Sequence, residues 1–141
     1  MVSRGIYFTP TLATFERQAG DDNAENYEVK AFQNMLTFVS MAHKAGVKIV
    51  TSSHTSSRYS EPGWTYQREM ELLAEAGLSP MEVIQASTLV NAHYFRSQDR
   101  IGSIEEGKLA DLVIIDGNPL ENISRAKNIE RVMLNGQWVT E

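Results

Sequence analysis

Residues 101–141, IGSIEEGKLADLVIIDGNPLENISRAKNIERVMLNGQWVTE, determine the fold class expected for the last third of this chain. Within this stretch, residues 109–116 form an apolar run rich in Val, Leu and Ile, bounded by glycine on one side and by Gly-Asn-Pro on the other. This pattern predicts a buried strand. Further on, Asn135-Gly136 separates two short apolar segments, and Asn-Gly accepts both positive-φ positions of a type I′ hairpin turn. The stretch therefore predicts a compact antiparallel β unit.

The first third of the chain predicts a strand, a helix and a second strand with short connections. Residues 5–9 form an aromatic and β-branched run that Pro10 stops, and the small polar residues 18–26 predict a surface loop. From Ala31 onward, apolar residues recur at helical spacing until Gly46, a residue that commonly ends a helix. Residues 47–51 then form the second strand. This order is the βαβ arrangement of a parallel sheet.

Two further helices are predicted before the β unit. Residues 66–76 place Met70, Leu72 and Leu73 towards a core. The second helix has a complete start signal, because Ser79 can act as N-cap, Pro80 suits the first helical position and Glu82 completes a capping box. We expect that helix to run to about residue 94.

Composition limits the partners and leaves the compartment open. The chain has 141 residues, the size of one ordinary domain, and its 13 basic and 18 acidic residues give a formal charge of −5. Without a Lys/Arg run, nucleic acid and anionic membranes are not expected partners. No apolar run approaches the roughly 20 residues of a membrane span. The absence of cysteine excludes disulfides and thiolate metal sites; with no apolar signal core in residues 1–5, we expect a cytoplasmic location by default.

The order of several spaced residues resembles the carboxyl end of the metal-dependent amidohydrolase superfamily, closest to the branch with imidazolonepropionase-like and Xaa-Pro dipeptidase-like members. The residues that carry the resemblance are Ile101-Gly102-Ser103-Ile104, Gly107-Lys108, Ala110-Asp111-Leu112-Val113, Asn118-Pro119-Leu120, Val132 and Asn135-Gly136. The resemblance implies an α/β fold in which residues 1–98 are the C-terminal portion of a (β/α)8 TIM-type barrel. Residues 99–141 would then be the small antiparallel β unit of a composite sandwich. Because a complete barrel needs about 200 residues or more, the chain is expected to be the last part of a longer protein.

The resemblance also points to a site residue, His54. Residues 46–50 resemble the eighth barrel strand, which in the family usually ends in Gly-Thr-Asp or Gly-Ser-Asp, the Asp being a metal ligand and general base. Here the matching residues are Ser52-Ser53-His54. The resemblance therefore implies His54 as the catalytic base and metal ligand, although a neutral imidazole lacks the charge of a carboxylate. From the residues alone, His54 as an ordinary hydrogen-bonded loop residue stays open.

Two residues are candidates for binding substrate. Thr11 belongs to the segment Thr9-Pro10-Thr11-Leu12, which resembles the substrate-facing loop after the seventh barrel strand. Arg58 lies in the polar loop after the second strand, where it would line a pocket or simply face solvent.

Most ligands of the family's metal site have no counterpart in this sequence. The family's His-x-His pair, bridging Lys or Glu and two single histidines are missing, and the histidines present are His43, His54 and His93. A catalytic zinc needs about three protein ligands. We therefore expect a divalent metal, zinc by preference, only in a completed protein, and no catalysis by this chain alone.

Two functions stay open at this stage. The first is the C-terminal part of a hydrolase acting on amide or cyclic amide C–N bonds of a small molecule. The second is a non-catalytic module of the same ancestry that binds a ligand or self-associates. An upstream coding sequence with His-x-His would favour the first, and a natural start at Met1 the second. Both predict association, because an incomplete barrel leaves strand edges and apolar helix faces uncovered.

Overall fold

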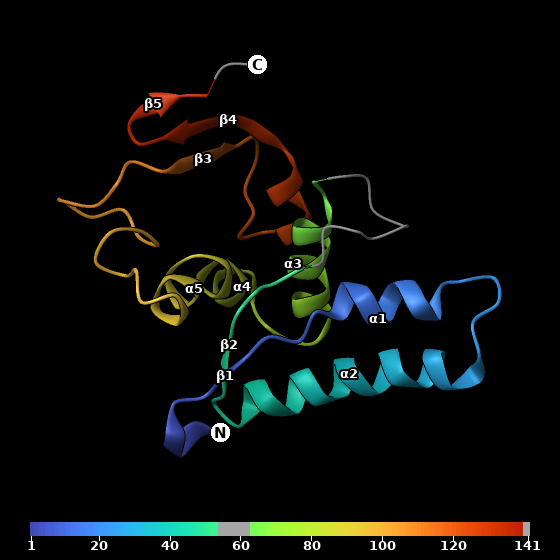
Figure 1. Ribbon diagram of the computed structural model, residues 1–141. Helices are drawn as coiled ribbons and strands as arrows, with labels where there is room; N and C mark the ends of the chain where they lie inside the picture. Colours follow the sequence, from blue (N-terminus) through green and yellow to red (C-terminus); the bar gives the residue numbers. More distant parts are fainter. Residues whose placement is uncertain (54–62, 140–141) are drawn as a thin grey trace.

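The computed structural model describes residues 1–53 and 63–139. Its elements, shown in Figure 1, belong to one parallel and one antiparallel sheet with helices between them. In chain order they are η1 (Val2–Arg4), β1 (Tyr7–Phe8), α1 (Leu12–Ala19), α2 (Asn26–Lys44), β2 (Lys48–Ile49), α3 (Thr65–Glu75), α4 (Pro80–Ser87), α5 (Leu89–Tyr94), β3 (Leu112–Ile115), η2 (Ile123–Lys127), β4 (Ile129–Leu134) and β5 (Gln137–Trp138).

The predicted parallel pair is confirmed. Strand β1 pairs with β2 in parallel, with Tyr7 opposite Lys48 and Phe8 opposite Ile49. Two helices connect the strands, α1 and α2, and they lie side by side in Figure 1. The parallel pairing places the carboxyl ends of both strands at the same edge of the sheet.

Helix α1 was not predicted, and the reason lies in how it begins. Its N-cap residue, Thr11, makes no side-chain capping hydrogen bond. The backbone N–H groups of Leu12 and Ala13 are bound instead by Glu69, which lies 57 and 56 residues further along the chain. A cap that distant leaves no local start signal before the helix.

Most other helix boundaries follow local signals. Helix α2 begins with a capping box formed by Glu25 and Glu28, earlier than predicted, and Gly46 follows its end with a φ of 75°. The capping box of Ser79 and Glu82 starts α4 as predicted. The predicted single helix is interrupted at Thr88, whose φ of −127° and ψ of −88° separate α4 from α5.

The core is centred on α3. Leu72 and Leu73 of this helix are fully buried, as are Leu12 of α1, Val39 of α2 and Val83 of α4. Helix α3 contacts α1, α2, α4 and η2. It therefore joins the parallel strands and their helices to the β unit.

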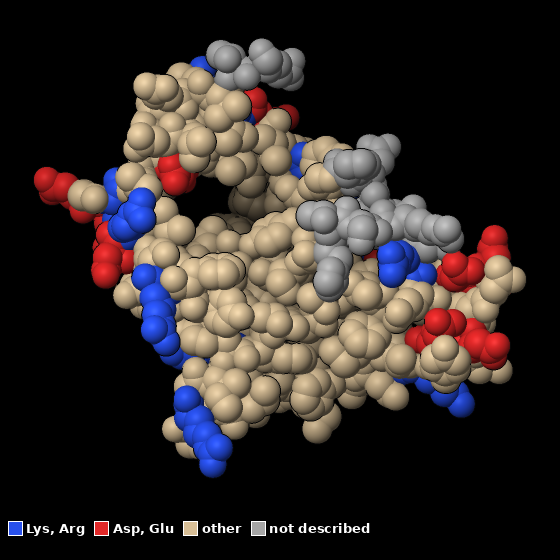
Figure 2. All heavy atoms as spheres, in the orientation of Figure 1, with Lys and Arg blue, Asp and Glu red and all other residues tan. Residues whose placement is uncertain are grey.

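The antiparallel unit has the strand order β3-β4-β5, and its hairpin turn is confirmed. Asn135 and Gly136 both have positive φ, at 49° and 77°. The prediction of a buried β3 is wrong, because the side chain of Val113 is 54% exposed. No second sheet covers this unit in the described residues, and Figure 2 shows a hollow between it and the helices.

The β unit is attached through η2. Ile123 and Ala126 of η2 are buried in the core, and Lys127 forms an ion pair with Glu71 of α3 at 2.6 Å. Glu71 also accepts a hydrogen bond from Arg68 at 2.8 Å. Apolar burial and a partly buried ion pair thus act at one junction.

Substitutions of Gly102 and Gly107 can show how closely the turn of residues 101–108 must approach α5. Gly102 and Gly107 both have positive φ, but a Cβ at Gly102 would lie 2.6 Å from the Cβ of Ala92, while a Cβ at Gly107 would meet nothing within 4 Å. We expect Gly102→Ala to lower the free energy of unfolding by about 1–3 kcal/mol more than Gly107→Ala, because only the first adds a clash to the backbone strain. Urea unfolding of both variants measures this. Equal losses would show that the turn moves away from α5 without penalty.

Candidate functional site at the carboxyl ends of the parallel strands

The candidate site lies at the edge where β1 and β2 end, because ligands of parallel α/β sheets bind at the carboxyl ends of the strands. The segment after β1 leads through buried Pro10 to Thr11, and the segment after β2 leads through buried Thr51 to Ser53. Both segments are held by side chains from the helices that follow β2.

Thr11, one of the predicted substrate-binding residues, lies directly at this edge. Its backbone is left-handed, with φ 50° and ψ 47°, and its side chain is half-buried. A β-branched residue rarely adopts this conformation. The chain turns at Thr11 from β1 into α1, and the first two amides of the helix point to Glu69.

Glu69 is a fully buried carboxylate that faces the start of α1. Its Oε1 accepts the N–H of Leu12 and its Oε2 the N–H of Ala13, both at 2.8 Å. Burial raises the pKa of Glu69 to about 7, and the two backbone hydrogen bonds limit that rise. The charge of Glu16, on α1, raises it further.

The end of β2 is held by a separate hydrogen-bond network. The Nδ2 atom of Asn91 donates to the carbonyl oxygen of Thr51 at 2.9 Å and to the hydroxyl of Tyr66 at 3.1 Å. The hydroxyls of Thr51 and Ser87 lie 2.7 Å apart, and the Thr51 N–H donates to the carbonyl of Ala86 at 3.2 Å. Tyr66 donates to the carbonyl of Ser87, and burial raises the pKa of Tyr66. Helices α3, α4 and α5 therefore fix Thr51 together.

Two buried side-chain oxygens, one next to Thr51 and one on α3, stand out among the described residues. The Oγ of Ser52, which follows Thr51, and the Oε1 of Gln67, on α3, have no hydrogen-bond partner within the described residues. Buried polar atoms of this kind are uncommon in folded proteins. Within the described residues, Ser52 thus leaves a buried polar atom without a partner directly after Thr51.

The other predicted site residues, His54 and Arg58, lie outside the described residues. Over residues 1–53 and 63–139, no three His, Asp or Glu side chains gather closely enough to hold a metal ion. The described residues therefore do not make up the metal site that the family resemblance implies.

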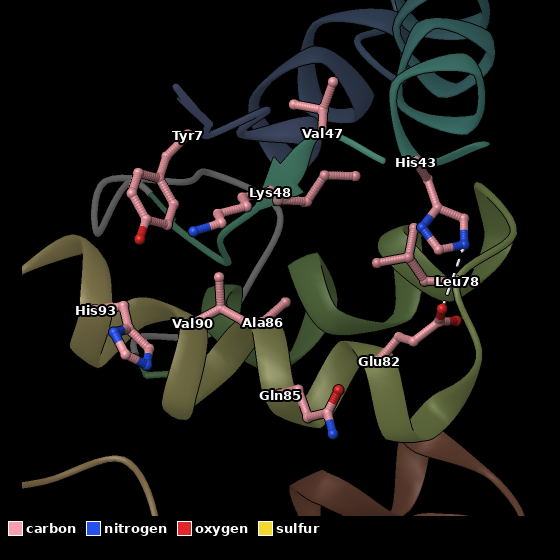
Figure 3. Close-up of a pocket in the computed structure, with 11 residues that line it drawn as sticks. Tyr7, His43, Val47, Lys48, Leu78, Glu82, Gln85, Ala86, Val90 and His93 are labelled. Atoms are coloured by element: carbon pink, nitrogen blue, oxygen red, sulfur yellow. Dashed lines mark ion pairs between the residues drawn. The ribbon is translucent and has the colours of Figure 1, made fainter. Parts of the chain in front are cut away.

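The two described histidines belong to a different region. Both line a pocket of about 220 Å³ between β2 and α4, and Figure 3 places them at its opposite ends. His43 lies in the last turn of α2, with its Nε2 3.6 Å from a carboxylate oxygen of Glu82 on α4. Lys48 lies over the ring of Tyr7, with its Nζ 5.2 Å from the ring centroid. The pocket lies along the edge of β2 that does not pair with β1.

Comparison with known proteins identifies the chain. The model of the amidohydrolase family matches residues 1–139. The chain belongs to this family. Its relatives include an adenine deaminase from Leuconostoc citreum (strain KM20), 30% identical over 107 residues, which are 76% of this chain and 18% of the relative. An imidazolonepropionase from Micrococcus luteus is 34% identical over 77 residues, or 51% of this chain and 18% of that protein.

Solved structures match all or nearly all of the chain. A Xaa-Pro dipeptidase with methionine bound in its active site has a TM-score of 0.83 at 30% identity, covering 100% of this chain and 36% of its own. A putative prolidase from Bifidobacterium longum gives 0.83 at 28% identity, covering 96% of this chain and 35% of its own. The chain thus spans about a third of these structures and about a fifth of the curated relatives it matches.

Sequence reasoning named Thr11, whose role in binding substrate stays a prediction, but it did not name the residues that hold the two strand ends. Glu69 offered a signal, because a carboxylate at this position shares its helix face with Leu72 and Leu73, three and four residues on. A charged residue on the apolar face of a helix implies a specific buried partner. Asn91 and Ser87 carry no comparable signal, since polar residues at their positions are ordinary in helices.

The raised pKa of Glu69 predicts a pH dependence of stability. In the unfolded chain a Glu has a pKa of about 4.5, whereas folding raises the pKa of Glu69 to about 7. The folded state therefore holds this proton more tightly. The resulting stabilisation is complete below pH 4.5 and is lost as pH rises to about 7, by about 3 kcal/mol.

Urea unfolding of the chain and of Glu69→Gln across this pH range measures the effect. The unfolding free energy of the unmodified chain should fall relative to that of the variant, which lacks the titrating group. Comparison with this variant cancels other carboxylates such as Glu71, whose pKa is lowered by Lys127 and Arg68 in spite of burial. If the difference in unfolding free energy between the unmodified chain and Glu69→Gln stays constant with pH, the raised pKa of Glu69 is contradicted.

Proposed function

We propose that this chain is the carboxyl-terminal part of an amidohydrolase that hydrolyses C–N bonds in amides or cyclic amides of small molecules. In this proposal residues 1–98 supply strands seven and eight of a (β/α)8 barrel with their helices, and residues 99–141 supply part of a small β-sandwich. The observation that carries the proposal is the match of the whole chain to 36% of a Xaa-Pro dipeptidase at a TM-score of 0.83. The remaining six strands of the barrel would come from the completing polypeptide.

The open edge of β2 supports this reading. The Val50 N–H donates to Phe8 in the parallel ladder, so alternate residues turn their N–H groups to the side away from β1. There Val47 and Thr51 find acceptors in Ala42 and Ala86, while Ile49 between them lines the pocket of Figure 3. No strand pairs with this edge in the described residues. Parallel sheets are normally larger and buried on both faces, so a further strand fits here.

The β unit supports the same reading from the other end of the chain. Cross-strand neighbours Val113 and Val132 share one face of the sheet, and their side chains are 54% and 36% exposed. Figure 2 shows charged side chains mainly at the margins of an uncharged face, without a continuous basic surface. An uncovered apolar sheet face is typical of one half of a sandwich.

The names of the relatives suggest the class of bond. A Xaa-Pro dipeptidase, an imidazolonepropionase and an adenine deaminase all act at a carbon–nitrogen bond. Amidohydrolases generally depend on metal, and a zinc ion would polarise the carbonyl and activate water. The described residues do not supply its ligand set. We propose that the completing polypeptide holds the metal and that His54 is the contribution of this chain.

The catalytic proposal is tested with a chimaera. The matching third of the Xaa-Pro dipeptidase is replaced by this chain, and hydrolysis of Xaa-Pro dipeptides is measured with Zn²⁺ beside the isolated chain. We expect turnover by the chimaera and none above buffer by the isolated chain, because one ligand candidate does not make a catalytic zinc site. Activity of the isolated chain would refute the need for completion.

A folded but inactive chimaera would favour the alternative, a non-catalytic binding or self-association module. Light scattering on the isolated chain separates these outcomes further. Oligomers that Val113→Thr and Val132→Thr do not disperse would indicate a specific interface elsewhere. Threonine keeps the β-branched shape of valine but makes the sheet face polar.

A second prediction concerns His54 in the active chimaera. His54 stands at the position of the family's Asp. The His54→Ala substitution should therefore lower kcat by about 10²–10⁴-fold, as expected for the loss of a general base. His54→Asp should retain more activity than His54→Ala. His43→Ala is the matched control, since His43 lies in the last turn of α2 beside Glu82 and should leave kcat unchanged. Equal turnover of all variants would remove His54 from the mechanism and leave it a loop residue.

A further inference from the structure

Glu69 is the residue of α3 whose two carboxylate oxygens both bind the backbone of the segment after β1. Its side chain is 0% exposed, and each carboxylate oxygen accepts one backbone N–H at 2.8 Å. These amides belong to the two residues immediately after Thr11. Two charge-assisted hydrogen bonds therefore fix the backbone on one side of Thr11.

Thr11 itself is in a conformation that its side chain disfavours. A φ of 50° and a ψ of 47° place it in the left-handed region, where the Cβ of an L-residue crowds the following carbonyl. A threonine at a helix N-cap ordinarily has an extended backbone and caps the helix with its hydroxyl. Here it makes no such hydrogen bond. The capping task has moved to Glu69, which leaves the Thr11 hydroxyl outside the cap.

We propose that Glu69 is a positioning residue that holds Thr11 in the left-handed conformation at the carboxyl end of β1. The proposal deepens the proposed function, because its catalytic meaning rests on Thr11 facing the substrate of a completed amidohydrolase. The carboxylate binds the amides of Leu12 and Ala13 and so fixes the direction in which the chain leaves the strand. Backbone strain stored in this way is typical of functional sites.

The choice of a carboxylate supports this role. A buried charge costs more than an apolar side chain of similar size, and the surrounding core of Leu12, Leu72 and Leu73 would accept an apolar residue. A carboxylate offers a separate, charged oxygen to each of the two adjacent amides, as Glu69 does here. The nearest charges do not compensate Glu69, because Arg68 is engaged by Glu16 and Glu71, and Glu16 raises the pKa of Glu69.

Hydrogen exchange of the full 141-residue chain, followed by NMR, tests the proposal. In Glu69→Gln one amide loses its acceptor, since the side-chain NH₂ replaces an oxygen. We expect the amide that loses its acceptor to exchange about tenfold faster or more, and the other amide, which keeps only a neutral acceptor, to exchange faster by a smaller factor. Amides in the middle of α2 are the internal reference. Glu71→Gln is the matched control, because Glu71 lies on the same helix but binds Lys127 and Arg68; it should leave both amides unchanged.

A second substitution, Thr11→Gly, shows whether Glu69 positions Thr11 or only stabilises the fold in general. Glycine adopts the left-handed conformation without strain and has no side chain that could cap the helix. Glu69→Gln combined with Thr11→Gly should therefore recover at least about half of the lost protection on a logarithmic scale. Unchanged amide exchange in Glu69→Gln, or no recovery in the double variant, would overturn the proposal.

If Glu69→Gln fails to fold, a pH titration of the unmodified chain followed by NMR still tests the proposal. The amide proton shifts of Leu12 and Ala13 should titrate together with one midpoint, because both protons bind the same carboxylate. The charged groups nearby are Glu16 of α1 and Arg68 of α3, with the ion pair of Glu71 on α3 and Lys127 on η2 further away. Glu16→Gln should lower the midpoint and leave both amides titrating. If the two amide shifts titrate with different midpoints, or do not titrate, Glu69 does not act as a clamp, that is, as the carboxylate that binds both amides and holds Thr11.

The two proposals fail separately. The exchange and titration experiments use this chain without substrate, so an inactive chimaera would count against the proposed function and leave Glu69 as a clamp on Thr11. Unprotected Leu12 and Ala13 amides would count against the clamp and leave the hydrolase proposal in place.

Discussion

The structure depends on the burial of α3 among elements from both ends of the sequence. Its apolar residues fill the core, its carboxylate Glu69 starts α1, and Glu71 pairs with Lys127 of η2. A helix packed on several sides has no free polar face, so each charged residue needs a specific partner. The same contacts that satisfy these charges fix the positions of α1 and the β unit. Without α3, the parallel strands and the antiparallel sheet would share few contacts.

Much of the fold follows from local sequence signals. Ser79-Pro80 with Glu82, the Asn135-Gly136 turn and Gly46 each specify a boundary within a few residues, and each boundary is where the sequence predicts it. Helix α1 could not be predicted in this way, because Glu69 caps it from 57 residues away. The exposure of β3 escapes prediction for another reason: an apolar run indicates what a strand prefers, while burial depends on what lies over the sheet.

The candidate site shows the same division between local and distant information. Thr11 stands in a segment that resembles a substrate-facing loop, so the sequence alone pointed to it. The network of Asn91, Tyr66 and Ser87 around Thr51 joins three helices to the end of β2, and no spacing in the sequence reveals it. Both strand ends are held by side chains of the following helices, so the loops beyond them start from fixed points. In parallel α/β folds, such fixed strand ends let loops change while the scaffold stays constant.

The distance in sequence between Glu69 and Leu12 has a consequence for how this part of the fold can be exchanged between proteins. The strands β1 and β2 with their two helices look like a self-contained unit of residues 1–53, of the kind that recombination or design would move as one piece. Moved alone, that piece would carry a helix whose first amides have lost their acceptor and a Thr11 turn with nothing to hold it. The smallest transferable module therefore extends through α3. An exchange at the apparent boundary after β2 would keep both strands but lose the backbone geometry of Thr11, the residue between β1 and α1.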